Sequence, residues 1–147
     1  MKIYIASDHV GLMLKKILIE HLQGKKYEVL DLGPSTDIRI NYTENTKKLC
    51  EKLIKEKSSN IGILICGTGV GMSMAANRFK GIRAALCTNE YMAKMTIKHN
   101  NANVLCLGSR VIGEELAKSI VDVFLSAQFE GGRHLSRVIQ LDQLCHI

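Results

Sequence analysis

Residues 61–73 read Ile61-Gly62-Ile63-Leu64-Ile65-Cys66-Gly67-Thr68-Gly69-Val70-Gly71-Met72-Ser73. A short apolar run without polar alternation is typical of a strand that is covered on both faces of a sheet. The three glycines after it let the backbone turn tightly and expose its N–H groups, which can bind an anion together with the start of a helix. The stretch therefore predicts a strand, an anion-binding turn and a helix, although a tight turn without a ligand would use the same glycines.

Other apolar runs extend this unit into a sheet. They are Ile3–Ala6, Ile82–Cys87, Val104–Gly108 and, less clearly, Glu28–Leu32. Apolar stripes at helical spacing fall between the runs, and in the first of them Lys15 and Lys16 lie on the opposite, polar face. Alternating strands and helices specify a parallel sheet with right-handed crossovers. We predict an α/β fold, a three-layer Rossmann-like sandwich with a five-stranded parallel sheet and helices on both faces, formed by a single domain over residues 1–147.

The composition excludes several classes of protein. No apolar run approaches the ~18 residues that a membrane span needs, and the N-terminal segment has no signal-peptide pattern. The net charge of +6 comes mainly from lysines on helical faces, with 5% aromatic residues and no nucleic-acid motif. We therefore expect a cytoplasmic protein that binds neither nucleic acid nor a membrane.

The cysteines and the glycine loop exclude other sites. Five cysteines without a C-x-x-C pair argue against a zinc module and a disulfide framework. The third glycine, Gly71, comes one residue too early for a dinucleotide fingerprint, and the next strand ends in Cys87-Thr88 rather than in an acidic residue that would hold a ribose. No Gly-Lys-Ser/Thr follows the loop either, so both nucleotide-binding interpretations are disfavoured.

Ligands of open α/β sheets bind beyond the carboxyl ends of the strands. The segments that follow the predicted strands are Ser7–Asp8–His9, Cys66–Gly71, Thr88–Asn89 and Gly108–Arg110. Cys66 could be an inert buried thiol, or a nucleophile or general base activated by the neighbouring amides. Asp8 could simply cap the following helix.

Two later motifs admit both a structural and a functional interpretation. His99-Asn100 closes a helix that begins near Glu90, where a histidine favours the helix C-terminus and an asparagine tolerates a left-handed conformation. Arg133 and Arg137 lie four residues apart on one face of a predicted helix. Two guanidinium groups so placed could hold a phosphate dianion, or they could belong to an exposed basic helix.

Taken together, these residues resemble the type B ribose-5-phosphate isomerases, within the family that includes the galactose-6-phosphate isomerase subunits. The resemblance runs from about residue 1 to 140 and is carried by Ser7–Gly11, Gly62–Gly71, Gly81–Ala85, His99-Asn100, Asn103-Val104, Gly108–Arg110 and Phe129–His134.

The resemblance implies a role for each candidate residue. Cys66 would be the base that moves a proton between C1 and C2 through a cis-enediolate, whose charge Thr68 and the backbone amides would stabilise. The amides are those of Gly67, Gly69, Val70, Gly71 and Ser73. His99 and Asp8 would help to open the furanose ring, while Asn100 and Tyr42 would face the sugar. The phosphate would be held by His9, Arg110, Arg133 and Arg137.

The resemblance also implies a metal-independent enzyme without a cofactor. Each site would form across a homodimer, with a dimer of dimers as the larger alternative, and the segment from about 131 to 147 would pack on the partner subunit. The expected reaction is the interconversion of ribose 5-phosphate and ribulose 5-phosphate in the pentose phosphate pathway.

Alternative functions remain open at this point. They are isomerisation of allose 6-phosphate or galactose 6-phosphate, and a non-catalytic sugar-phosphate sensor. The family usually has Asp-Tyr-Pro where this chain has Asn41-Tyr42-Thr43, which puts the rim of the sugar pocket and the substrate preference in question. The apolar Val70 and Met72 stand where some relatives carry a glutamate base.

Overall fold

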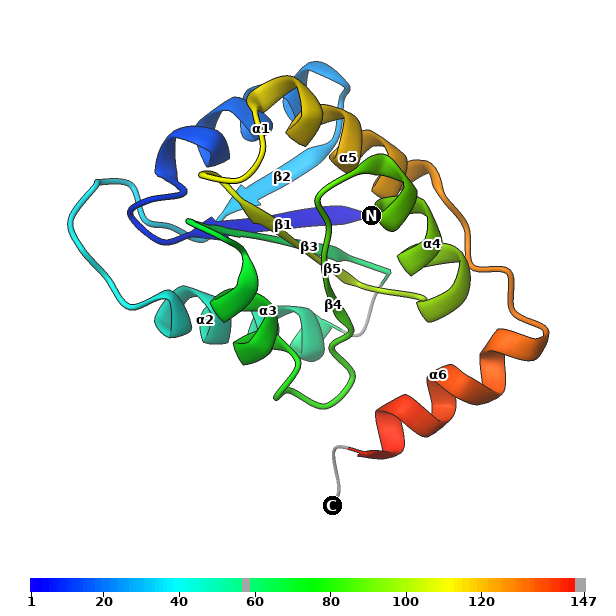
Figure 1. Cartoon of the computed structure of the whole chain (residues 1–147). Coiled ribbons are helices and arrows are strands. Elements are labelled where there is room, and N and C mark those ends of the chain that lie inside the picture. The colour runs from blue at the N-terminus through cyan, green and yellow to red at the C-terminus, as the bar shows by residue number, and fades with distance from the viewer. Residues whose placement is uncertain (57–58, 145–147) are drawn as a thin grey trace.

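A five-stranded parallel sheet forms the centre of the protein, with the strand order β2-β1-β3-β5-β4 (Figure 1). The computed structural model describes residues 1–56 and 59–144. The strands are β1 (Lys2–Ser7), β2 (Glu28–Asp31), β3 (Ile61–Cys66), β4 (Ala84–Leu86) and β5 (Val104–Gly108). The predicted α/β fold and its parallel sheet are confirmed, although the strand expected at 82–87 is only three residues long.

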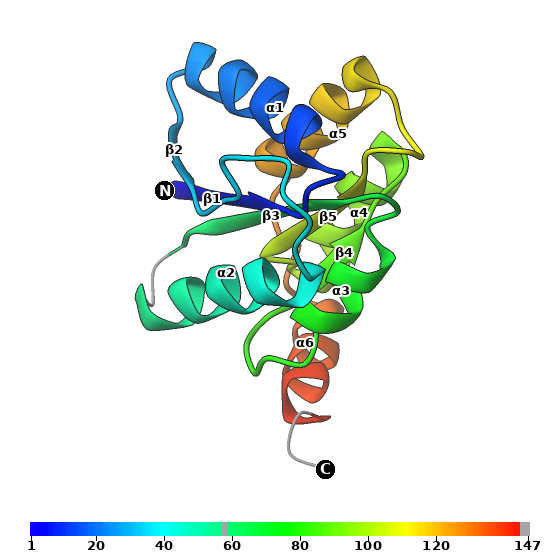
Figure 2. The same cartoon turned by 90° about the vertical axis from the view of Figure 1, so that its left-hand side faces the viewer.

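Helices cover both faces of the sheet, as Figure 2 shows edge-on. They are α1 (Leu12–Gly24), α2 (Tyr42–Glu56), α3 (Val70–Ala76), α4 (Glu90–Asn100), α5 (Glu114–Ser126) and α6 (Arg133–Gln143). Helices α1, α4 and α5 pack on one face, while α2 and α3 pack on the other. No helix in the described ranges combines the length and the apolar character that crossing a bilayer would require.

The apolar runs supply both halves of the core because successive side chains of a strand point to opposite faces. Ile63 of β3 points towards α1, α4 and α5, while its neighbour Leu64 points towards α2 and α3. Both side chains are fully buried. This two-sided burial explains why the strands read as continuous apolar runs rather than as alternating ones.

Helix α6 leaves the body of the sandwich and packs against α4 (Figures 1 and 2). Arg83 connects the two parts: its Nη1 donates to both carboxylate oxygens of Asp142, at 3.1 and 3.0 Å, and its Nε donates to the Asn101 carbonyl at 2.8 Å. Leu135, Ile139 and other apolar side chains of this region stay about half exposed. Residues 145–147 of the predicted tail lie outside the described residues.

The assignment of Lys15 to a polar helix face was wrong. Its side chain is fully buried, and its Nζ donates to Asp31 Oδ1 at 2.6 Å and to the Pro34 carbonyl at 2.5 Å. Helical spacing placed Lys15 correctly on α1, but the end of β2 and the loop that follows it cover that part of the helix. The buried ammonium group therefore ties α1 to the segment that leads towards the carboxyl edge of the sheet.

Lys15→Ala should lower the free energy of unfolding by about 2–3 kcal/mol, because it removes a buried ion pair and the packing of the lysine stem. Urea unfolding at a fixed protein concentration measures this change. The matched control is Lys16→Ala, at the exposed neighbouring position, with an expected effect within about 0.5 kcal/mol. Equal effects of the two substitutions would show that the buried pair does not stabilise the fold.

Candidate active site

Cys66 ends β3 at the carboxyl edge of the sheet, where the chain turns into the glycine loop. The residue is only 6% exposed, and the Gly69 amide donates to its Sγ at 3.1 Å. A hydrogen bond from an amide strengthens when the sulfur carries negative charge. The local geometry therefore suits a thiolate, as expected of a nucleophile or a base.

The glycine loop is shaped by close backbone contacts. Gly69 adopts a left-handed conformation with φ +78°, and a Cβ there would lie 2.5 Å from Leu86 Cδ1. Gly108 of β5 lets the loop approach from the other side, since a Cβ on it would lie 2.6 Å from the Thr68 carbonyl oxygen. The N–H groups of Thr68 and Gly71 donate no backbone or side-chain hydrogen bond within the described chain, so they can serve an incoming anion.

Other predicted residues surround this loop. The Asp8 carboxylate accepts from the Gly11 amide at 2.9 Å and so caps the turn that leads into α1. The Arg110 amide donates to the Gly67 carbonyl at 3.0 Å, and its guanidinium lies beside Gly67. The ring of Tyr42 lies against Gly71, where a Cβ would meet it at 3.0 Å. His9, Val70 and Ser73 occupy the same edge, so this edge collects the thiol, a carboxylate and a cation.

Ser109 supports the glycine loop, although the sequence indicated it only as part of the motif Gly108–Arg110. Its amide donates to the Cys66 carbonyl at 2.9 Å, and its hydroxyl lies 3.2 Å from the carbonyls of both Cys66 and Val10. This residue therefore ties the segments after β1, β3 and β5 together. Asn89, by contrast, caps α4 by accepting from the Met92 amide at 2.9 Å, which accounts for its place after β4.

The remaining predicted residues lie at the opposite edge. Helix α4 ends with His99 and Asn100 close to the start of β5, whose Val104 pairs with Gly62 near the start of β3. Arg133 and Arg137 are exposed on α6, beside that end of α4. The length of the strands separates this edge from Cys66 by about 15–20 Å. In Figure 1 the strand carboxyl ends lie at the left and α6 at the lower right.

His99 belongs to a cluster that the sequence analysis missed. Its ring stacks on the His134 ring with centroids 4.3 Å apart and an interplanar angle of 14°. Glu130 lies beside both rings, and its Oε1 pairs with Lys98 Nζ at 2.6 Å. The one pattern in the sequence that could have indicated this cluster is the spacing of Glu130 and His134, which lie four residues apart. The left-handed residue after α4 is Asn101, with φ 49°, rather than Asn100.

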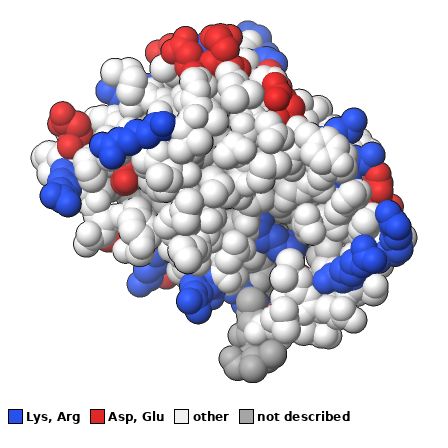
Figure 3. Space-filling model, in the orientation of Figure 1, with Lys and Arg blue, Asp and Glu red and all other residues white. Residues whose placement is uncertain are grey.

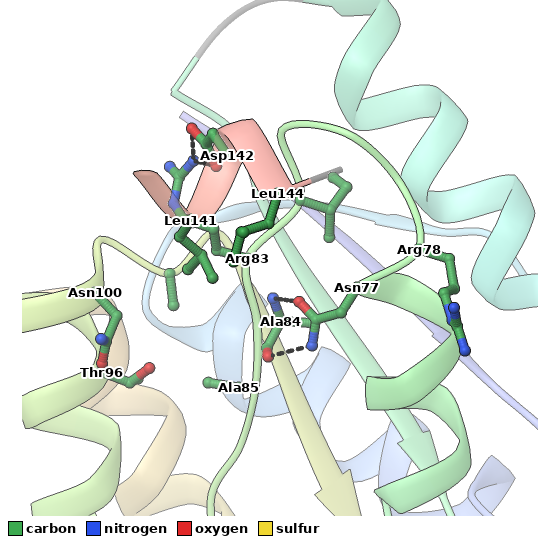
Figure 4. Close-up of a pocket in the computed structure, with 12 residues that line it drawn as sticks. Asn77, Arg78, Arg83, Ala84, Ala85, Thr96, Asn100, Leu141, Asp142 and Leu144 are labelled. Atoms are coloured by element: carbon green, nitrogen blue, oxygen red, sulfur yellow. Dashed lines mark hydrogen bonds and ion pairs between the residues drawn. The ribbon is translucent and has the colours of Figure 1, made fainter. Parts of the chain in front are cut away.

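Two cavities are lined in part by predicted site residues. A cavity of about 560 Å³ lies between α4, β4 and α6, and Asn100 is part of its wall (Figure 4). Figure 4 also shows Asn77 bonded to the backbone of Ala84, and Arg83 paired with Asp142. The second cavity, of about 470 Å³, is lined by His9, Lys16 and the loop 35–37. The larger cavity therefore lies away from the thiol, beside the group of residues at the amino edge.

The other described cysteines have the properties of inert core thiols. Burial raises the pKa of Cys50 to about 12 and that of Cys87 to about 11. Burial also raises the pKa of Cys106 well above its ordinary value. None of these three sulfurs has a hydrogen bond from an amide within the described residues, so Cys66 differs from them in both position and contacts.

Comparison with known proteins identifies similar sequences and structures. The family described as Ribose/Galactose Isomerase matches residues 3–141. Ribose-5-phosphate isomerase B of Escherichia coli K12 is 47% identical over 137 residues, which cover 93% of this chain and 91% of that protein. The Clostridium thermocellum ribose-5-phosphate isomerase B structure has a TM-score of 0.95 at 46% identity and covers 98% of this chain and 97% of its own. The Mycoplasma genitalium enzyme with bound ribulose 5-phosphate has a TM-score of 0.93 at 48% identity, covering 97% and 95%.

Iodoacetamide at pH 8 should alkylate Cys66 at least about tenfold faster than Cys50, Cys87 or Cys106, because thiolate character and access control this reaction. Peptide mass mapping measures the rate at each site. The test protein carries Cys145→Ser, which removes a thiol that lies outside the described residues. Adding Cys66→Ser should abolish the fast reaction; uniform labelling of all four thiols would contradict the assignment.

Proposed function

The chain belongs to the ribose/galactose isomerase family, and from this premise we propose that it interconverts ribose 5-phosphate and ribulose 5-phosphate. One observation carries the proposal: the Cys66 thiol and the free amides of Thr68 and Gly71 belong to the same turn at the carboxyl edge of the sheet. An aldose–ketose isomerase needs a base and oxyanion donors at one place.

Cys66 would act as the base. In the direction from aldose to ketose, its thiolate removes the proton on C2, and the electron pair forms a cis-enediolate. The same thiol then returns a proton to C1. The amides of Thr68 and Gly71 would stabilise the negative charge on the enediolate oxygens, where donors that are already in place contribute most.

A second proton must pass from O2 to O1 to complete the isomerisation. The Thr68 hydroxyl oxygen accepts a hydrogen bond from the Val70 amide at 3.3 Å, which leaves its own proton free to bond a substrate oxygen. Tyr42, which lies against Gly71, would form the wall of the sugar pocket. Arg110 and His9 would contribute to phosphate binding from the same edge.

The complete reaction also needs ring opening and further phosphate ligands. For these steps we propose His99 with Asp8, Asn100 on the sugar hydroxyls, and Arg133 with Arg137 on the phosphate. In a single chain Asp8 lies at the carboxyl edge and the other four at the amino edge. We infer that a second copy of the chain brings its amino-edge group to the Cys66 loop of the first, so that two chains share each site.

Surface chemistry supports this pairing of two copies. In the described part of the tail, up to residue 144, the exposed apolar side chains are Leu135, Ile139, Leu141 and Leu144. Figure 3 shows that the centre of the face carrying α4 and β4 is nearly free of Lys, Arg, Asp and Glu, with basic side chains at its lower right margin, beside α6. An uncharged area beside exposed apolar side chains is suited to contact with another chain. The homodimer, the cytoplasmic location and the pentose phosphate role stay predictions.

The test of the function is turnover of ribose 5-phosphate and of allose 6-phosphate in the presence of a metal chelator. We expect efficient turnover of ribose 5-phosphate, a preference of at least about tenfold over the six-carbon sugar, and no loss on chelation. Cys66→Ala should remove isomerisation while leaving sugar-phosphate binding.

Each of the other possible results of this assay contradicts a different part of the proposal. A preference for allose 6-phosphate would assign the altered Asn41–Thr43 rim to a larger substrate. Binding without turnover of either sugar would identify a sensor. Near-normal turnover by Cys66→Ala would remove Cys66 as the base.

A further inference from the structure

Glu130 divides its two carboxylate oxygens between different partners. Oε1 pairs with Lys98 Nζ at 2.6 Å, and the Glu130 amide donates to the Lys98 carbonyl at 3.1 Å. Oε2 faces two imidazoles instead, at 3.6 Å from His134 Nε2 and 4.0 Å from His99 Nε2. The end of α4 thus holds the carboxylate in place, with one oxygen directed towards the two rings.

His134 is held more firmly than His99. Its side chain is only 6% exposed, against 38% for that of His99, and its Nε2 has no hydrogen-bond partner among the described residues. Burial lowers the pKa of His134, and nearby His99, Arg133 and Arg137 lower it further, while Glu130 opposes them. A neutral, fixed ring therefore lies against the ring of His99, which is more exposed.

A metal ion does not account for this cluster. The ligand atoms of His99, Glu130 and His134 lie within 4.8 Å of one another. The two rings are nearly parallel and stacked, so their nitrogen lone pairs run side by side instead of converging on one point. Lys98 also takes up one of the two carboxylate oxygens. The arrangement is better suited to orienting one imidazole and stabilising its charged form.

We propose that Glu130 and His134 are positioning residues for His99 in ring opening; this inference rests on the proposed function. In that step His99 gives a proton to the ring oxygen O4, the C1–O4 bond breaks, and the O1 proton passes to a base, leaving the aldehyde at C1. His134 holds the plane of the donor ring by stacking, and Glu130 Oε2 stabilises the imidazolium before the transfer.

The charged groups near His99 come from α4, from α6 and from the segment that precedes α6. Glu130 is the acidic group that faces it; Lys98 of α4 pairs with Glu130, and Arg133 and Arg137 of α6 act on the neighbouring His134. Because Glu130 is the acidic group that pairs with His99 and the neighbouring charged side chains are basic, the loss of Glu130 should disfavour the imidazolium. Lys98 lowers the pKa of Glu130, so the carboxylate stays ionised throughout the neutral range.

The experiment separates ring opening from proton transfer at carbon. Ribose 5-phosphate is mainly a closed furanose, whereas ribulose 5-phosphate has no free hydroxyl that could close a five-membered ring. Turnover of ribose 5-phosphate therefore requires ring opening, while deuterium wash-in from D₂O into C1 of ribulose 5-phosphate requires only the base. The variants are His134→Phe, which keeps a stacking ring, His134→Leu, which does not, Glu130→Gln, and His99→Asn as the reference.

We expect His134→Leu and Glu130→Gln to lower kcat for ribose 5-phosphate at least about tenfold, with deuterium wash-in within about twofold of the parent protein. His134→Phe should keep most of the turnover. In Glu130→Gln the alkaline limb of the pH profile should move to lower pH, since removal of a negative charge disfavours the protonated donor. In NMR spectra, the ring-proton resonances of His99 should keep their ring-current shift in His134→Phe and lose it in His134→Leu.

Parallel losses of turnover and wash-in, or equal losses in the Phe and Leu variants, would overturn the positioning role. An unaltered ratio of turnover to wash-in in His99→Asn would remove His99 as the donor and overturn the proposal with it. If the parent protein converts neither sugar, the proposed function fails. The NMR comparison then still decides whether His134 orients His99.

Discussion

The separation between Cys66 and His99 follows from the way in which a parallel sheet is connected. Each crossover helix must run back along the strands, so a residue at the end of such a helix lies at the edge opposite to the strand ends. Cys66 ends β3, and His99 lies in the last turn of α4. The strand length separates the two residues by about 15–20 Å, and for this reason the proposed function takes them from two different chains.

The carboxyl edge is organised around short backbone contacts. Gly69 and Gly108 let the loop and β5 approach more closely than side chains would allow, and Ser109 bonds to the segments on both sides. The result is a thiol held by an amide beside two N–H groups that have no partner in the described chain. Preorganised donors of this kind need little rearrangement when charge develops, which is the property that an enediolate intermediate requires.

Features of the fold and the site could be predicted from the sequence where nearby residues determine them, and could not where contacts between distant segments do. Glycines and apolar runs act within a few residues, so the strands, the turn after β3 and the placement of Asp8 and Arg110 could be inferred from the sequence. Lys15 could not, because its burial depends on a loop some twenty residues further along the chain. The stack of His99 on His134 depends on how α6 returns to α4, a tertiary contact without a periodic signal apart from the spacing of Glu130 and His134. The proposed sharing of each site between two chains leaves no pattern within one sequence.

Complementation between two inactive variants tests the shared site most directly. One chain carries Cys66→Ala and the other His99→Asn, with different affinity tags, and tandem purification after co-expression isolates the mixed dimer. If each site takes Cys66 from one chain and His99 from the other, one of the two sites is intact and the turnover of ribose 5-phosphate per dimer is about half that of the parent protein. If the mixed dimer is no more active than either variant alone, or if no mixed dimer forms, the claim that two chains build each site is wrong.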